Sequence, residues 1–263
     1  MNLLIILLLN CLSCAENLPK YEFPAKTIYS IEEINESCST GLIEDSKSLF
    51  NFFESNALDV LSSVDKDIEN KLSLSIYNIY KDSIVEHSSK SKILNIIGDM
   101  KPYLSRKKEY QIYIVKTKTL NAMVAPGGNI FITTGFLDFV KNDAELAVIL
   151  GHELGHVENG HIDKIVKRKS AMNEYGSLGH VAENIAYTFI APFGSIDEYI
   201  SDRSGLYLAY QAGYDPMIGI EALKRMSSMD GEKNSINEFF KTHPYSIDRY
   251  VCSKNYLHSI LTQ

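Results

Sequence analysis

The chain has 263 residues, of which 45% are hydrophobic and 22% are charged, and its formal net charge is −7. These proportions are close to globular averages, so they exclude a disordered or collagen-like chain, and the length suits one large domain or two small ones. A mildly acidic chain is poorly suited to general nucleic-acid binding, and we expect no nucleic-acid partner.

The first residues predict the compartment. Residues 3–9 are all Leu or Ile, a run too short to cross a bilayer as a helix but of the right length for the apolar part of a secretory signal peptide. No Lys or Arg precedes this run, so an amphiphilic N-terminal anchor is the alternative. We expect residues 1–14 to be a signal peptide and the protein to be exported.

The four cysteines fall into two groups. Cys11 and Cys14 lie in the expected leader, and Leu-Leu-Asn before Cys11 is similar to a bacterial lipobox, so the protein is expected to be periplasmic or lipid-anchored to the envelope membrane. Cys38 and Cys252 could form one disulfide in an oxidising compartment or remain two free buried thiols. Neither a zinc ribbon nor a thioredoxin motif is expected, because the chain has no Cys-x-x-Cys.

Residues 15–263 are expected to form one domain, whose first part, about residues 42–105, is predicted to be helical. Apolar side chains recur there three and four residues apart, with Asp, Lys and Ser between them, as in a helix that packs one face against a core. This stripe consists of Leu49, Phe50, Phe53, Ala57, Leu61 and Val64.

The second part of the domain, about residues 106–263, is predicted to be the catalytic core. Residues 110–115 and 129–134 are rich in β-branched and aromatic side chains and predict two strands. Ala-Pro-Gly-Gly at residues 125–128 predicts a turn before the second strand. Asn142 or Asp143 is expected to cap the helix that follows. The fold class is therefore α+β and mainly helical.

The strongest chemical signal is His152-Glu153-Leu154-Gly155-His156, inside a stretch, residues 143–160, that is predicted to be helical. Residues four apart on a helix differ by about 40° and by about 6 Å in rise, so both imidazoles project toward one point. Zinc is bound by such neutral nitrogen donors, and Glu153 flanks the metal in a position that suits a base. The alternative is two surface histidines on an amphipathic helix.

A catalytic zinc needs a third protein ligand and an open position. His161 and His180 are two candidates. His161 follows His156 by five residues, which is about 140° round a continuous helix, so a surface or helix-end position is expected for it. His180 has no helical partner to fix it, and a loop or surface position is expected.

Glu198 is the third candidate, with Asp202 four residues later on one face of a second predicted helix. One carboxylate could bind zinc while the other hydrogen-bonds a ligand histidine and sets its orientation. Ser195 and Glu198 could instead form a capping box at the start of this helix. With the two-histidine motif upstream, zinc ligation by Glu198 is favoured.

These residues resemble the gluzincin metalloendopeptidases of the HtpX, Oma, BepA and CAAX-prenyl-protease family. The resemblance covers roughly residues 110–251 and is specific in order and spacing, although Ser201 stands where the family has Ala. The agreeing segments are Asn-Ala-Met-Val-Ala-Pro-Gly-Gly-Asn-Ile-Phe-Ile at 121–132, Glu-Leu-Ala-Val-Ile-Leu at 145–150, Glu198-x-x-x-Asp202, and Thr242-His243-Pro244 with Arg249.

The resemblance implies a zincin-like fold, with a small sheet beside the helix of the two histidines and a second helix that carries the Glu ligand. It implies one Zn²⁺ per chain, held by His152, His156 and Glu198, with Glu153 as the general base. It also implies that His243 is either a hydrogen-bond donor to the transition state or a gate that approaches the metal.

The resemblance also implies supporting and substrate-binding residues. Asp202 would orient a ligand histidine, and Arg249 would be its partner or a structural residue. An edge strand would bind extended substrate by strand addition, which tolerates many sequences; an ordinary strand beside the core is the alternative. The residues implied for this strand are Asn129, Ile130, Phe131 and Ile132.

The expected function is that of a zinc-dependent endopeptidase that hydrolyses extended or misfolded polypeptides in cell-envelope quality control. The alternatives are a zinc-containing, chaperone-like envelope protein with little proteolytic activity, and a structural zinc site, which would need four closed ligands. Residues 185–193 are the most apolar stretch after the leader. They are too short to span a membrane and contain Pro192, so they are expected to pack between the two metal-binding helices or to form a flap.

Overall fold

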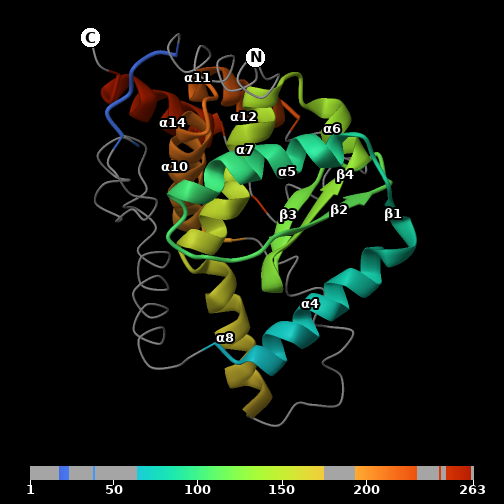
Figure 1. The fold of residues 1–263 in the computed structure, drawn as a ribbon. Coiled ribbons are helices and arrows are strands. Elements are labelled where there is room, and N and C mark those ends of the chain that lie inside the picture. Colours follow the sequence, from blue (N-terminus) through green and yellow to red (C-terminus); the bar gives the residue numbers. More distant parts are fainter. Residues whose placement is uncertain are drawn as a thin grey trace, which may run out of the picture.

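The computed structural model of the chain describes residues 18–23, 38, 64–174, 193–229, 243 and 247–261. The expected leader at residues 1–14, the apolar stripe at residues 49–61, His180 and residues 185–192 lie outside these ranges. The expected α+β class is confirmed: most of the described chain is helical, and four strands form one small mixed sheet (Figure 1).

The described helices are α4 (Lys66–Tyr80), α5 (Ser89–Met100), α6 (Thr134–Phe139), α7 (Asp143–Glu158), α8 (His161–Glu174), α10 (Ser195–Gln211), α11 (Pro216–Gly219), α12 (Glu221–Ser227) and α14 (Ile247–Ser259). The strands are β1 (Ile84–Val85), β2 (Gln111–Val115), β3 (Ala122–Ala125) and β4 (Asn129–Thr133). The helical region expected at about 42–105 is described from residue 64 onward, where it contains α4 and α5.

The sheet has the strand order β1-β2-β4-β3. The two predicted strands are β2 and β4, and they pair in parallel, from Gln111 opposite Asn129 to Val115 opposite Thr133. Strand β3 pairs antiparallel with the other side of β4. The expectation that residues 129–132 form an edge strand is therefore wrong, because both sides of β4 are occupied by neighbouring strands.

The turn between β3 and β4 depends on glycine. Gly127 and Gly128 have φ values of 76° and 78°, a backbone region that side chains with a Cβ rarely adopt. A Cβ added to Gly128 would lie 2.3 Å from the carbonyl oxygen of Glu109. The predicted turn is confirmed, and it places β3 antiparallel to β4, so that β3 is an edge strand of the sheet in the described part of the chain.

The two faces of the sheet pack against different helices, because successive strand residues point to opposite faces. One face, which includes Ile114 and Ile130, belongs to the large core that α5, α7, α10 and α14 share. The opposite face, which includes Phe131, packs against Leu72 of α4 and Val166 of α8. Helix α7 therefore lies directly beside β3, and it is buried along almost its whole length.

Helix α7 begins at a side-chain cap, since Asn142 Oδ1 accepts a hydrogen bond of 2.9 Å from the backbone N–H of Glu145. It then packs closely on α10 through small residues. A Cβ added to Gly151 would lie 2.9 Å from the Cα of Gly205, and one added to Gly155 would lie 2.8 Å from the Cβ of Ser204. Glycines at these positions let the two backbones approach, which brings the side chains of α7 to those of α10.

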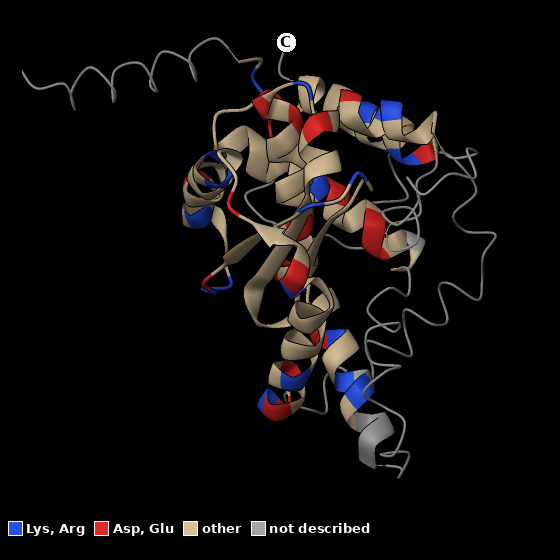
Figure 2. Ribbon diagram, turned by 90° about the vertical axis from the view of Figure 1, so that its right-hand side faces the viewer, with Lys and Arg blue, Asp and Glu red and all other residues tan. Residues whose placement is uncertain are grey.

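Two further features concern the periphery. Cys38 and Cys252 form a disulfide, which ties residue 38 to α14. Both basic and acidic residues occur where α4 and α8 come together (Figure 2), and Arg106 and Lys108 form ion pairs with Asp163 of α8. Among the described residues, no helix has both the length and the apolar character that crossing a membrane requires.

Candidate metal centre

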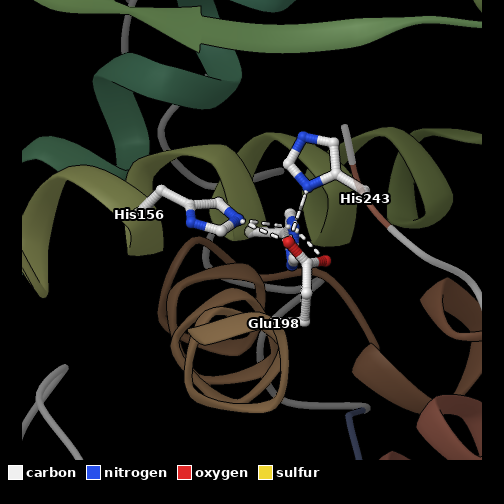
Figure 3. Close-up of side chains that lie close together, drawn as sticks. His156, Glu198 and His243 are labelled. Atoms are coloured by element: carbon white, nitrogen blue, oxygen red, sulfur yellow. Dashed lines mark hydrogen bonds and ion pairs between the residues drawn. The ribbon is translucent and has the colours of Figure 1, made fainter. Parts of the chain in front are cut away.

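Four buried side chains converge at the contact between α7 and α10. His152 and His156 come from α7 and Glu198 from α10, and His243 comes from the segment before α14. One potential ligand atom from each residue lies within 4.8 Å of those of the other three. Figure 3 shows the polar atoms of His156, Glu198 and His243 pointing toward one another. No more than 1% of any of these residues is exposed.

The distances show how closely the donor atoms are grouped. The Nε2 atoms of His152 and His156 are 3.1 Å apart. Oε1 of Glu198 lies 3.4 Å from Nε2 of His156 and 3.0 Å from Nδ1 of His243. The four-residue spacing brings the two imidazoles of α7 together, as the sequence predicts. Glu198 faces these histidines instead of capping its own helix. The N-cap of α10 is Gly194, with no side-chain hydrogen bond to the cap.

The donor set fits a zinc ion. Oε2 of Glu198 is buried, forms an ion pair with Arg249 and lies 3.6 Å from Nε2 of His152. Three imidazoles and one carboxylate are nitrogen and oxygen donors of the kind that zinc takes.

The protonation states also suit a metal. Burial lowers the pKa of His156 well below its usual range, so this ring is neutral. Burial raises the pKa of Glu198, but the Arg249 guanidinium and then His243 outweigh it and hold the pKa well below its usual range. Metal ligands must be neutral imidazoles and ionised carboxylates, and these two groups already are.

Glu153 lies beside the cluster without belonging to the group of four donors. Its Oε2 accepts a hydrogen bond of 2.8 Å from the backbone N–H of Val124 in β3. Its Oε1 is buried, has no hydrogen-bond partner among the described residues, and lies 3.5 Å from Nε2 of His243. Burial raises the pKa of Glu153, while His243 and then His152 offset part of the rise.

Asp202 and Arg249 support the ligands from α10 and α14. Oδ1 of Asp202 lies 2.9 Å from Nδ1 of His152. The guanidinium of Arg249 donates through Nε to Oδ2 of Asp202, at 2.8 Å, and through Nη2 to Oδ1, and its Nη1 pairs with Glu198. Arg249 is 2% exposed. One buried cation therefore holds both the ligand carboxylate and the carboxylate that faces His152.

Strand β4, which is predicted to bind substrate as an edge strand, lies inside the sheet between β2 and β3. Asn129 of β4 donates through its side-chain amide to Ser73 of α4 and to the carbonyl oxygen of Pro126, on the α4 side of the sheet. Of the described strands, the one at the edge of the sheet beside α7 is β3, and the backbone N–H of its Val124 donates to Glu153. Strand order is a tertiary property, and the local pattern of β4 carries no signal for it.

His161 is a residue that sequence reasoning misplaced. It is 2% exposed, and its Nδ1 lies 2.9 Å from Nδ1 of His156. The surface position expected for it assumed a helix that continues through residue 160. Helix α7 ends at Glu158, and Gly160, with a φ of 75°, turns the chain so that α8 starts at His161. A glycine after an apolar helix is a common helix stop, and that signal could have found it.

Burial lowers the pKa of His161 to about 4, so this ring is neutral near pH 7.

An aromatic ring covers His156. The ring of Phe193, just before α10, stacks on the ring of His156 with centroids 3.9 Å apart. Phe193 is the one described residue of the apolar stretch at residues 185–193, and it covers one face of a potential zinc ligand.

Comparison with known proteins agrees with this geometry. The model of the family described as Peptidase family M48 matches residues 90–251. The mitochondrial metalloendopeptidase OMA1 of Arabidopsis thaliana is 28% identical over 142 residues, which are 51% of this chain and 29% of that protein. OMA1 of Schizosaccharomyces pombe is 29% identical over 152 residues, which are 54% of this chain and 44% of that protein.

A bacterial relative has similar coverage. The beta-barrel assembly-enhancing protease of Yersinia pestis is 23% identical over 165 residues, which are 56% of this chain and 34% of that protein. The matched part of this chain thus spans less than half the length of each of these three curated relatives. The matched residues include both histidines of α7, Glu198 and Arg249.

Proposed function

Because the chain belongs to peptidase family M48, we propose that it is a zinc metalloendopeptidase that hydrolyses peptide bonds of extended or misfolded polypeptides. The observation that carries the proposal is the buried cluster of His152, His156 and Glu198 with Glu153 beside it. A chaperone-like zinc protein has no use for Glu153. Oε1 of that residue accepts no hydrogen bond from the described residues, which leaves it available to a water and favours the enzyme.

His152, His156 and Glu198 would hold the zinc. When bound, zinc supplies a Lewis acid that polarises the scissile carbonyl and lowers the pKa of water. Glu153 accepts the proton of the attacking water at Oε1 and delivers it to the leaving amine, while its Oε2 stays anchored to β3. A raised pKa suits both halves of this task, because the same group must take up and release one proton.

His243 faces both the base and the ligand carboxylate, at 3.5 Å from Glu153 and 3.0 Å from Glu198. Burial lowers the pKa of His243, but Glu198 and then Glu153 outweigh it, so its pKa is raised. An imidazole N–H in this position can donate a hydrogen bond to the oxyanion that develops during the attack. We assign it that role. Asp202 and Arg249 keep His152 and Glu198 oriented.

For substrate binding we propose the edge strand β3 in place of β4. In an antiparallel ladder, successive residues direct their backbone groups alternately toward and away from the partner strand. Val124 donates to Glu153 and therefore points away from β4, and so does Ala122, two residues earlier. A peptide added along this edge lies beside the base and is held mainly by backbone hydrogen bonds. Residues Asn129–Ile132 would support β3 from the neighbouring strand.

The compartment and the physiological role rest on further observations. The Cys38–Cys252 disulfide favours an oxidising compartment, in agreement with the exported, lipid-anchored form that residues 1–14 predict. One relative is named a beta-barrel assembly-enhancing protease. We therefore propose that this chain removes misfolded envelope proteins.

The purified full chain tests the proposal. Zinc per chain and casein cleavage are measured for the wild type and for Glu153→Gln side by side. The proposal expects one zinc in both proteins and cleavage by the wild type alone, because the substitution removes the base and keeps the ligands. One zinc without cleavage by either protein would favour the chaperone-like alternative. Cleavage by Glu153→Gln at the wild-type rate would refute the assignment of the base.

A further inference from the structure

The two histidines of α7 are held from behind in different ways. Nδ1 of His152 faces the carboxylate of Asp202 at 2.9 Å. In the described part of the chain, the group that faces Nδ1 of His156 at this distance is another imidazole: it lies 2.9 Å from Nδ1 of His161, the first residue of α8. His161 in turn places its Nε2 3.3 Å from Oδ1 of Asp197, on the first turn of α10.

The directions of these hydrogen bonds follow from the site. Nε2 of His156 faces His152 and Glu198, at 3.1 and 3.4 Å, and must present a lone pair to a metal there. A neutral imidazole with a free lone pair on Nε2 carries its hydrogen on Nδ1, so Nδ1 of His156 donates to Nδ1 of His161. A His161 ring that accepts a hydrogen bond at Nδ1 carries its own hydrogen on Nε2, where it is directed at Asp197.

Ser201 also contacts this group. Its hydroxyl lies 3.3 Å from Nδ1 of His161 and is buried. A hydroxyl can donate or accept a hydrogen bond, so this contact is compatible with the tautomer in which Nδ1 of His161 is an acceptor.

We propose that His161 is a positioning residue for the zinc ligand His156: its Nδ1 accepts a hydrogen bond from the Nδ1–H of His156, and its Nε2–H donates a hydrogen bond to Asp197. These three residues are called the His161 relay. The proposal deepens the proposed function, because it rests on zinc binding by the same cluster. The relay fixes the tautomer and the ring orientation of His156, as Asp202 does for His152. Groups that orient a ligand in this way typically contribute 10- to 100-fold to metal affinity or activity.

The test measures zinc affinity of the full chain by competition with a chelator, which needs no proteolytic activity. His161→Leu places an apolar side chain in this buried position and removes the acceptor, and we expect zinc affinity to fall about 10- to 100-fold. His161→Asn places its Oδ1 where Nδ1 of the histidine lies, so it retains the acceptor. We expect it to recover most of the lost affinity.

Ile162→Ala is the matched control, because Ile162 is the next residue of α8 and is also 2% exposed. It creates a cavity without touching the relay, so we expect lower thermal stability and unchanged zinc affinity. Equal loss of affinity in Ile162→Ala and His161→Leu would reduce His161 to a packing residue. Wild-type affinity in His161→Leu would also overturn the proposal.

A variant at the outer end of the relay keeps the test decisive if His161→Leu does not fold. Asp197→Ala removes the last acceptor at a side chain that is 21% exposed, and a smaller loss of zinc affinity is expected. Asp163→Ala, which removes a carboxylate of α8 paired with Arg106, controls for charge and should retain zinc affinity. Equal affinities in these two variants would overturn the relay. A wild-type chain that binds no zinc would refute the metal centre itself, which distinguishes the two failures.

Discussion

The replacement Arg249→Met tests how the site tolerates two buried carboxylates. The Arg249 guanidinium is 2% exposed and contacts Asp202 through two nitrogens and Glu198 through the third. Both carboxylates are buried, and for both the pKa is raised by burial and then lowered most by Arg249. Methionine fills much of the same space but leaves both charges without their partner.

The magnitude follows from this arrangement. Removing one partner of a buried ion pair costs about 3–5 kcal/mol, because an uncompensated charge remains in the interior. In a protein of this size, each kcal/mol shifts the melting temperature by about 2–4 °C. We therefore expect the chelator-treated Arg249→Met protein to melt about 6–20 °C below the wild type. Zinc should also stabilise it less than the wild type, because Glu198 is no longer held in place.

The assay is thermal and urea unfolding of the full chain, with chelator and with zinc. At zinc concentrations of about 100 times the dissociation constant, the wild type should gain about 2.7 kcal/mol. Arg225→Met is the matched control, since it removes a guanidinium that pairs with buried Glu145 away from the cluster; it should retain the full gain from zinc. Equal unfolding free energies for Arg249→Met and wild type in chelator would refute the reasoning.

The remaining predictions concern packing and pH. Gly155→Ala places a Cβ 2.8 Å from a side-chain atom of α10, so we expect about 1–3 kcal/mol of destabilisation and less bound zinc. The control is Gly98→Ala, whose added Cβ meets nothing within 4 Å, and it should retain the stability and the zinc content of the wild type. Equal zinc content and stability in the two variants would contradict the close contact between α7 and α10. Burial raises the pKa of Glu145, but the hydrogen bond from Arg225 and then one from a backbone N–H outweigh it, so the pKa lies below 4.5. The ionised Glu145 therefore contributes fully to stability above that value, and its contribution is lost as the pH falls through the lower folded pKa. Urea unfolding should show a smaller loss of stability below pH 4.5 in Arg225→Met than in the wild type. Identical pH profiles of the two proteins would contradict the role of Arg225 in lowering the pKa of Glu145.

Local patterns predicted the parts of this protein that depend on short spacings. The four-residue interval between His152 and His156 places both rings on one face of a helix whatever surrounds it, and the structure confirms the helix and the convergence of the rings. The two β-rich runs and the Pro-Gly-Gly turn were also recognised, because strand propensity and positive φ angles at glycine act within a few residues.

The predictions that were wrong concern positions set by distant parts of the chain. Strand β4 was expected at an edge, but its neighbours β2 and β3 occupy both sides, and strand order follows from how the strands pair in three dimensions. His161 was expected at the surface because the helix was extended past Gly160. The break at that glycine instead turns α8 so that His161 lies behind His156.

The sequence by itself determined the chemistry of this protein: two histidines and a glutamate in helical register, and a second helix with paired carboxylates, specify a zinc site because ligand type and helical period are local properties. Only the tertiary structure decided which groups complete that site. Glycine contacts between α7 and α10 bring Glu198 to the histidines, β3 anchors Glu153, and α14 supplies Arg249. The Val124–Glu153 contact joins residues 29 positions apart and the Arg249–Asp202 contact joins residues 47 positions apart, and separations of that size are closed by packing, which no local pattern encodes.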